Sequence, residues 1–178
     1  MSLIAFFGAL ESGLIYGLVA LGVLLSFRTL DFPDLTADGS FPLGGAVAGI
    51  SIVAGVNPWL ACAFGMLAGS VAGIVTAWLH VKLGILQLLA SILVMVALYS
   101  VNLRIMGAPN LPLLGETTVF STLVTNGNGY WMRCLIIGVV VAIAMLFLNW
   151  FYSTETGLSM RATGSNLRMA QAQGINTS

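Results

Sequence analysis

Five long apolar blocks constrain this chain more than any other feature of its sequence. Inside a bilayer no water satisfies the backbone N–H and C=O groups, so a block that crosses one, about 20 residues, must be helical. Barrel strands would alternate apolar and polar residues over about 10 positions, and these blocks do not. They cover residues 3–27, 43–56, 59–78, 83–103 and 131–152, and the second is short for a full crossing. The sequence predicts an all-α polytopic membrane protein with about five transmembrane or re-entrant helical segments.

Polar stretches separate and follow these blocks. The first, a polar turn at 28–42, contains Pro33, Gly39 and Pro42, which predict that no continuous helix runs through it. The second, at 104–130, is expected to form an outer loop. We therefore expect a transmembrane helical bundle over 1–152, followed by a polar C-terminal tail over 153–178.

Tryptophans and basic residues indicate where the membrane boundaries lie. Trp59 and Trp78 are about 19 residues apart, as are Trp131 and Trp150, and each separation of roughly 28 Å matches the hydrocarbon core. A cytoplasmic tail places Arg28, Lys82, Arg161 and Arg168 inside and Arg104 and Arg133 outside. Five full crossings then put the N-terminus outside. If 28–56 instead enters and leaves on the outer side, the N-terminus is inside.

Six polar residues are candidates for a translocation path: Glu11, Asp31, Asp34, Asp38, Tyr99 and Asn102. A carboxylate as deep as Glu11 costs at least ~2.5 kcal/mol in lipid, so it faces either a water-filled path or a hydrogen-bonding partner in the protein. The three aspartates form either pathway contacts or a polar turn in which Asp38 or Ser40 caps the next helix. Tyr99 and Asn102 either line a pore or join helices by hydrogen bonds.

Small and isolated residues have simpler interpretations. Gly13 and Gly17, and Gly65, Gly69 and Gly73, recur at the four-residue spacing that lets helices approach closely in lipid. Cys62 and Cys134 have no metal or redox spacing and are interpreted as small packing residues, and His80 as a hydrogen-bonded residue at a helix end.

Several classes of function have no support in the sequence. No catalytic Ser-His-Asp set, paired carboxylate or metal-ligand cluster is present, so an intramembrane enzyme has little support and no cofactor is expected. Nucleic-acid binding would need clustered Lys and Arg, whereas six basic residues balance six acidic ones. No phosphate-binding Gly-x-x-x-x-Gly-Lys-Ser/Thr loop occurs, so any ATP must be bound by a partner.

The C-terminal tail is polar and contains one predicted helix. Ser165 or Asn166 is expected to cap a short helix over 167–173, with Gly174 as its stop. A helix this short is marginal by itself, so we expect it to dock onto another protein. The alternative is a loop between spans of a longer chain.

The tail resembles the cytoplasmic coupling segment of permease subunits in ATP-binding-cassette importers of the branched-chain amino acid and ribose type. The matching residues, in order, are Gly157, Arg161, Ala162, Asn166, Met169, Ala170, Gly174, Ile175 and Asn176. The beginning of the chain is similar to the opening of the same family, through Asp31, Phe32, Gly39, Phe41 and Gly44. The stretch that starts at Asp34 is more like a subfamily linked to amino acids, including aromatic ones.

The resemblance implies a permease subunit in a multi-pass bacterial inner membrane. It implies cytoplasmic ATPase subunits, a second permease subunit (as a homodimer) and a periplasmic or lipoprotein substrate-binding protein as partners. The residues expected to couple to the ATPase are Gly157, Met160, Arg161, Ala162, Asn166, Arg168, Met169, Ala170 and Gly174. Family permeases are longer, so later spans are expected beyond this chain. The alternative function is a structural or assembly subunit without a pathway of its own.

Overall fold

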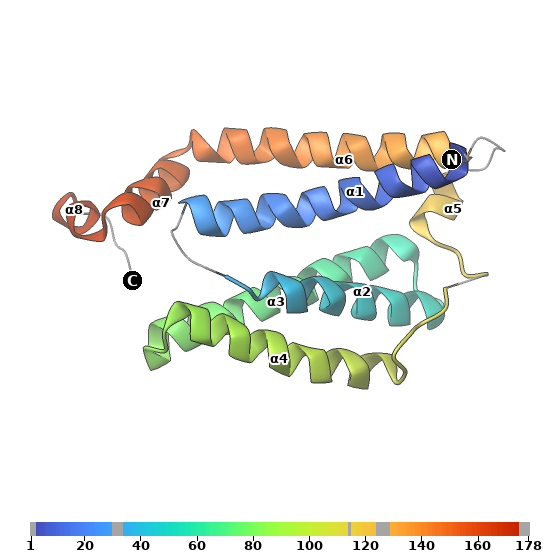
Figure 1. The fold of residues 1–178 in the computed structure, drawn as a ribbon, viewed down its shortest axis with the longest axis horizontal. Helices are drawn as coiled ribbons and strands as arrows, with labels where there is room; N and C mark the ends of the chain where they lie inside the picture. The colour runs from blue at the N-terminus through green and yellow to red at the C-terminus, as the bar shows by residue number, and fades with distance from the viewer. Residues whose placement is uncertain (1–2, 30–33, 114, 124–128, 175–178) are drawn as a thin grey trace. The chain divides into compact units, whose positions relative to one another are not determined.

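The computed structural model describes residues 3–29, 34–113, 115–123 and 129–174. Within these ranges the regular structure is entirely helical, which confirms the predicted fold class (Figure 1). The elements are α1 (Leu3–Leu24), the π-helix η1 (Leu25–Thr29), α2 (Ala37–Val53), α3 (Pro58–Leu83), α4 (Gln87–Met106), α5 (Val119–Leu123), α6 (Gly129–Tyr152), α7 (Glu155–Ser165) and α8 (Leu167–Ala172).

Four helical stretches are long and apolar enough to cross a membrane. They are Ala5–Phe27, Pro58–Leu83, Gln87–Met106 and Trp131–Tyr152, while α2 is apolar but shorter, with 17 residues. All four tryptophans expose more than half of their surface, as side chains at a lipid interface do. The protein is therefore a multi-pass membrane protein.

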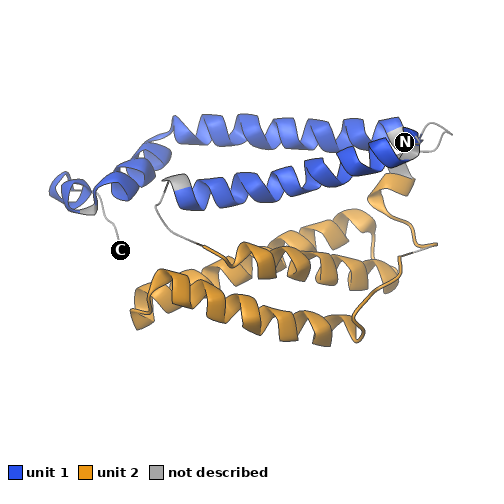
Figure 2. Ribbon diagram, in the orientation of Figure 1, with its two compact units in different colours: residues 1–33, 124–178 blue, residues 34–123 orange. Residues whose placement is uncertain are grey.

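The described residues form two compact units, and each is considered by itself (Figure 2). Unit 1 comes from 1–33 and 124–178, and unit 2 is formed by 34–123.

In unit 1, α1 lies beside α6 and runs in the same direction. The first turns of the two helices meet, because the rings of Phe7 and Trp131 are 5.3 Å apart and the Cys134 thiol donates a hydrogen bond to the Phe7 carbonyl oxygen at 3.3 Å. At the other end, η1 contacts α7, which follows α6. Cys134 is buried and free, as expected of a packing residue.

In unit 2, α2 packs against both α3 and α4. It approaches α3 most closely where Gly44 meets Gly65: a Cβ atom on Gly65 would lie 2.8 Å from the Gly44 carbonyl oxygen. This confirms a packing role for Gly65. Among the described atoms, nothing lies within 4 Å of a Cβ built on Gly13, Gly17 or Gly73, so the structure gives those three glycines no such role.

The start of α2 corrects the predicted polar turn at 28–42. The helix begins at Ala37 and runs through both Gly39 and Pro42, which were expected to interrupt it. Gly39 is tolerated because its missing side chain lets α4 approach: a Cβ there would lie 3.1 Å from Met95 Cα. Pro42 removes one N–H donor and leaves the rest of the helix intact. The predicted caps are also wrong, since Thr36 occupies the cap position and Asp34 Oδ1 accepts from the Thr36 N–H at 2.8 Å.

Local signals set the ends of the other unit 2 helices. The Asn57 side chain accepts from the Trp59 N–H at 3.1 Å at the start of α3, and Gly84 ends it with a positive φ of 65°. His80 Nδ1 lies 2.8 Å from the Ile85 carbonyl oxygen, consistent with its interpretation as a hydrogen-bonded residue at a helix end. The short α5 adds a helix to the predicted outer loop.

The Gly44–Gly65 contact predicts opposite effects of one substitution at two glycines of α3. Gly65→Ala should destabilise the helical bundle by about 1–3 kcal/mol, because the new methyl group meets backbone atoms that cannot move aside. Gly73→Ala should be neutral or stabilising by up to about 1 kcal/mol, since that position is open and alanine favours a helix. Unfolding in mixed detergent micelles measures both, and equal stabilities would contradict the packing seen here.

Candidate functional site

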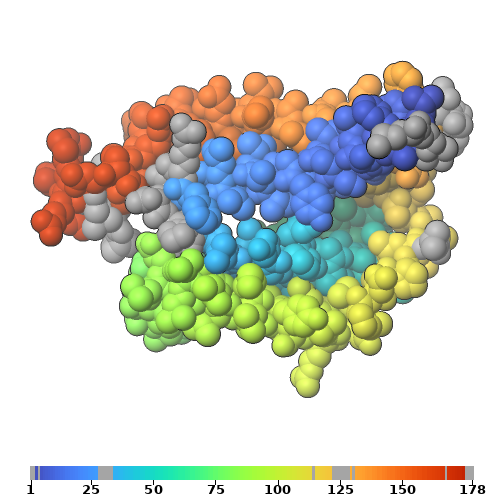
Figure 3. Space-filling view, viewed as in Figure 1, coloured from blue at the N-terminus to red at the C-terminus, as the bar shows by residue number. Residues whose placement is uncertain are grey.

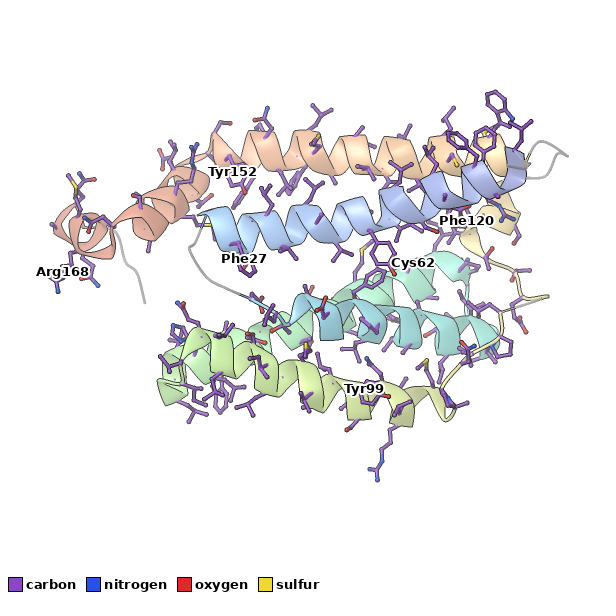
Figure 4. The ribbon with its side chains drawn as sticks, viewed as in Figure 1. Phe27, Cys62, Tyr99, Phe120, Tyr152 and Arg168 are labelled. Carbon is purple, nitrogen blue, oxygen red and sulfur yellow. The ribbon has the colours of Figure 1, made fainter. Side chains whose placement is uncertain are left out.

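Three of the six predicted path residues line one groove of unit 2. The groove lies between α2 and α4 and has a volume of about 590 Å³. Asp38 from the first turn of α2 and Tyr99 and Asn102 from α4 supply its polar groups. Figure 4 labels Tyr99 on α4. The structure therefore brings Asp38 to the same groove as two residues that lie about 60 positions later in the sequence.

Asn102 is the deepest polar group of the groove. Its side chain is only 5% exposed, and its amide nitrogen donates a long hydrogen bond of 3.5 Å to the Gly39 carbonyl oxygen. Its carbonyl oxygen, Oδ1, is buried and has no hydrogen-bond partner among the described residues. A buried acceptor without a donor costs about 1–3 kcal/mol, so this oxygen is a strong candidate for a ligand contact.

The remaining walls of the groove are apolar. Pro42 contributes from α2, and Met95, Val96, Leu103 and Met106 from α4. Tyr99 and Val96 are 67% and 59% exposed, so the groove is open on one side. The site therefore combines a few polar groups with mostly apolar walls, a composition typical of small-molecule sites.

The groove follows the second half of α4, from Met95 to Met106, and continues to Pro109. Gly39 packs against Met95 and Leu98, which are about 12 to 17 Å along α4 from its start at Gln87, in a helix about 30 Å long. Asn102 is about 22 Å along the same helix, and a polar group within a membrane-crossing helix must be satisfied by protein, water or ligand.

A buried pair of threonines, missed by the sequence analysis, holds the start of α2 in place. Thr36 and Thr76 are 2% and 0% exposed, and their hydroxyl oxygens are 2.8 Å apart. The Thr76 hydroxyl donates to the Ala72 carbonyl oxygen at 3.2 Å, so its oxygen accepts from Thr36. Asp34 joins this network through the Thr36 N–H and acts here as a positioning residue. The sequence signal was weak, because Thr36 is one of several polar residues in the stretch 28–42 and Thr76 is a single threonine in an apolar block.

The other two path candidates lie elsewhere. Glu11 is half-buried in the middle of α1, in unit 1. Asp31 lies outside the described residues. Their participation in a path stays a prediction.

The C-terminal tail contains two helices where one was predicted. α8 begins after Asn166, whose Oδ1 accepts from the Met169 N–H at 3.1 Å, as the predicted cap requires. The additional helix α7 begins after Thr154, whose hydroxyl oxygen accepts from the Gly157 N–H at 3.3 Å. This cap, followed by Glu155 in the first turn, is a helix-start signal that the sequence analysis overlooked.

Gly157 makes the corner between α6 and α7. A Cβ on this residue would collide with the Phe151 carbonyl oxygen and would lie 2.8 Å from Tyr152 Cα, so only glycine fits. Because α7 also contacts η1, the tail touches the ends of both long helices of unit 1.

The predicted coupling residues divide into three groups. Gly157, Asn166 and Ala170 shape the tail, and Ala170 is 2% exposed. Gly174 follows α8 with a positive φ of 81°. Met160 and Ala162 are half-buried on α7, while Arg161, Arg168 and Met169 are exposed. Figure 3 shows α8 at the far end of unit 1, and Figure 4 shows Arg168 reaching outward from it. The exposed group is available to a partner.

The corner at Gly157 predicts a position-specific loss of stability in the tail. Gly157→Ala should displace α7 and increase cleavage of the tail by a protease about tenfold or more, because the methyl group meets the backbone of α6. Gly138→Ala in α6, with nothing within 4 Å of its Cβ position, is the matched control and should leave cleavage unchanged. Equal cleavage of the two variants would contradict the corner geometry.

Comparison with known proteins gives one consistent family. Residues 5–178 match the model of a family described as the permease component of a branched-chain amino acid transport system. A tyrosine transport system permease protein of Clostridioides difficile is 38% identical over 167 residues, which cover 94% of this chain and 54% of that protein. An uncharacterized protein of Rickettsia prowazekii is 36% identical over 160 residues, covering 89% of this chain and 54% of that protein.

A more distant relative is a probable branched-chain amino acid transport permease protein of Methanocaldococcus jannaschii. It is 26% identical over 183 residues, which cover 94% of this chain and 58% of that protein. The chain thus spans about half the length of the curated relatives it matches. No solved structure matches it.

Proposed function

Because this chain belongs to the family of branched-chain amino acid transport permease components, we propose that it is the transmembrane permease subunit of an ATP-binding-cassette importer. In this role it forms a path for a small solute, an amino acid or a similar molecule, across a bacterial inner membrane. The family match over residues 5–178 carries the proposal. The relatives named for tyrosine and branched-chain amino acid transport support an amino acid as the solute.

The importer needs partners that supply energy and substrate. Cytoplasmic ATPase subunits bind and hydrolyse ATP, a periplasmic or lipoprotein binding protein delivers the solute, and a second permease subunit, in a homodimer, completes the path. The exposed Arg161, Arg168 and Met169 of the tail are the contacts that we assign to the ATPase. The permease itself is a transporter rather than an enzyme.

The parallel course of α1 and α6 supports one of the two predicted topologies. If the tail is cytoplasmic, α6 runs from outside to inside, and α1 must do the same because the first turns of the two helices meet. The chain leaves α1 on the inside and enters α6 from the outside, so an odd number of crossings lies between the two helices. This number requires α2 to cross the membrane as well as α3 and α4. The N-terminus lies outside, and the α2–α3 turn lies outside too.

The contacts of α7 suggest how ATP hydrolysis moves the permease. A push on the exposed face of α8 is passed to α7, which touches α6 and η1. Both long helices of unit 1 therefore receive the displacement. The ATPase biases the bundle between two packings by contacting the tail differently in its two states.

Thiol labelling tests the orientation on which this proposal depends. On a background with Cys62→Ala and Cys134→Ala, Arg168→Cys and Lys82→Cys should be protected from a membrane-impermeant maleimide in intact cells and labelled after the membrane is opened. Ala54→Cys, in the exposed α2–α3 turn, is the matched control and should be labelled in intact cells. Labelling of Arg168→Cys from outside would rule out the coupling role, and with it the importer.

Charge reversal tests the role of the tail in transport. Arg168→Glu should reduce ATP-driven uptake by the assembled transporter about tenfold or more, because a charge-assisted contact worth about 1.5–3 kcal/mol is lost. Arg133→Glu, an exposed arginine at the opposite end of α6, is the control and should retain uptake. Full uptake by Arg168→Glu, with normal membrane insertion of both variants, would favour a subunit without a coupling role.

A further inference from the structure

The groove between α2 and α4 has hydrogen-bond acceptors among its lining residues. Asn102 lines the groove, and its Oδ1 is buried and has no donor among the described residues. The Asp38 carboxylate lines the same groove and is exposed to it. Pro42 has no N–H, so it donates no helical hydrogen bond to the Asp38 carbonyl oxygen, which is a third acceptor in this region.

Apart from the Tyr99 hydroxyl, the groove offers few donors to an anion. The backbone N–H groups at the start of α2 already have acceptors. The Asp38 N–H donates to the Leu35 carbonyl oxygen, and the Gly39 and Ser40 N–H groups donate to the Thr36 carbonyl oxygen. The Thr36 N–H is held by Asp34. No basic side chain is among the residues that line the groove. A carboxylate placed here would meet the Asp38 charge without a compensating positive charge in the groove lining.

These groups match one chemical class. A primary ammonium group carries three N–H donors and a positive charge, so it can satisfy three acceptors of which one is a carboxylate. The exposed ring of Tyr99 beside them adds a surface that attracts cations. The apolar walls formed by Met95, Val96 and Leu103 suit a hydrocarbon body.

We propose that this groove binds the ammonium end of a solute with an apolar body, with Asn102 Oδ1 and the Asp38 carboxylate as its principal contacts. The inference rests on the proposed transport function, and it specifies which part of the solute this subunit recognises. An amine without a carboxylate should then bind, whereas the corresponding carboxylate should not.

The test measures occupation of the groove without measuring transport. The full chain in lipid nanodiscs carries Cys62→Ala, Cys134→Ala and Val96→Cys, which places a thiol in the groove wall. Isoamylamine should slow the reaction of this thiol with a maleimide about tenfold, while isovalerate, with the same number of carbons, should leave the rate unchanged. Met66→Cys on the outside of α3, 74% exposed, controls for effects of the amine on the reagent.

Three variants and one matched control assign the contacts. Asp38→Asn should raise the amine concentration needed for protection at least about tenfold, whereas the matched change Asp34→Asn should not, because that carboxylate holds Thr36 instead. Asn102→Leu should abolish protection. Asn102→Asp keeps the acceptor oxygen and loses the N–H that donates to the Gly39 carbonyl oxygen, so this variant should preserve protection by the amine. Loss of protection in Asn102→Asp would show that Asn102 acts as a structural donor and would overturn the proposal.

Other outcomes separate this inference from the proposed function. If isovalerate slowed the thiol reaction as much as isoamylamine does, the site would be nonspecific and the proposal would be overturned. If sodium chloride slowed the reaction and tetramethylammonium chloride at the same concentration did not, the groove would be an alkali-metal site, which would also overturn the proposal. Absence of slowing in a chain with normal helical content would also overturn it. If the groove proposal failed in one of these ways, a cytoplasmic tail and ATP-coupled uptake would still support the importer. Conversely, labelling of the tail from outside would rule out the importer and would leave amine binding to the groove unaffected.

Discussion

The close approach of α2 to its two neighbours is the contact on which the rest of unit 2 depends. In lipid, no hydrophobic force draws helices together, so their association relies on packing and on hydrogen bonds between helices. Gly44 and Gly65 bring α2 and α3 into backbone contact, and Gly39 does the same for α2 and α4. Gly39 fixes how near α2 lies to α4, and so it determines where Asp38 and Asn102 lie on the two sides of the groove.

The tail depends on a comparable constraint in unit 1. Gly157 permits a corner that any side chain would block, and this corner places α7 against the ends of both long helices. Of the residues that match the coupling motif, several therefore determine shape, and only the exposed ones are free to contact a partner. A motif read from sequence combines these two kinds of residue without distinguishing them.

The fold class and most helix positions were predictable because apolar length and tryptophan spacing are local properties. The start of α2 was not, because Gly39 and Pro42 look like helix breakers unless the neighbouring helix that accepts them is known. The path candidates were chosen for their polarity alone. That Asp38, Tyr99 and Asn102 share a groove depends on contacts between segments about 60 residues apart, which spacing does not encode. Thr36 and Thr76 were overlooked for the same reason, since a threonine in a polar turn and a threonine in an apolar helix are each unremarkable alone.

The threonine pair has a consequence for how this protein can change in evolution. Each hydroxyl has a single hydrogen, so the order of donation runs in one direction, from Thr36 to Thr76 to the Ala72 carbonyl oxygen. Replacing Thr76 alone with an apolar residue strands the Thr36 hydroxyl without an acceptor, whereas replacing both leaves no polar group unsatisfied. Positions 36 and 76 should therefore covary among relatives, either both as hydroxyl residues or both as apolar ones of similar volume.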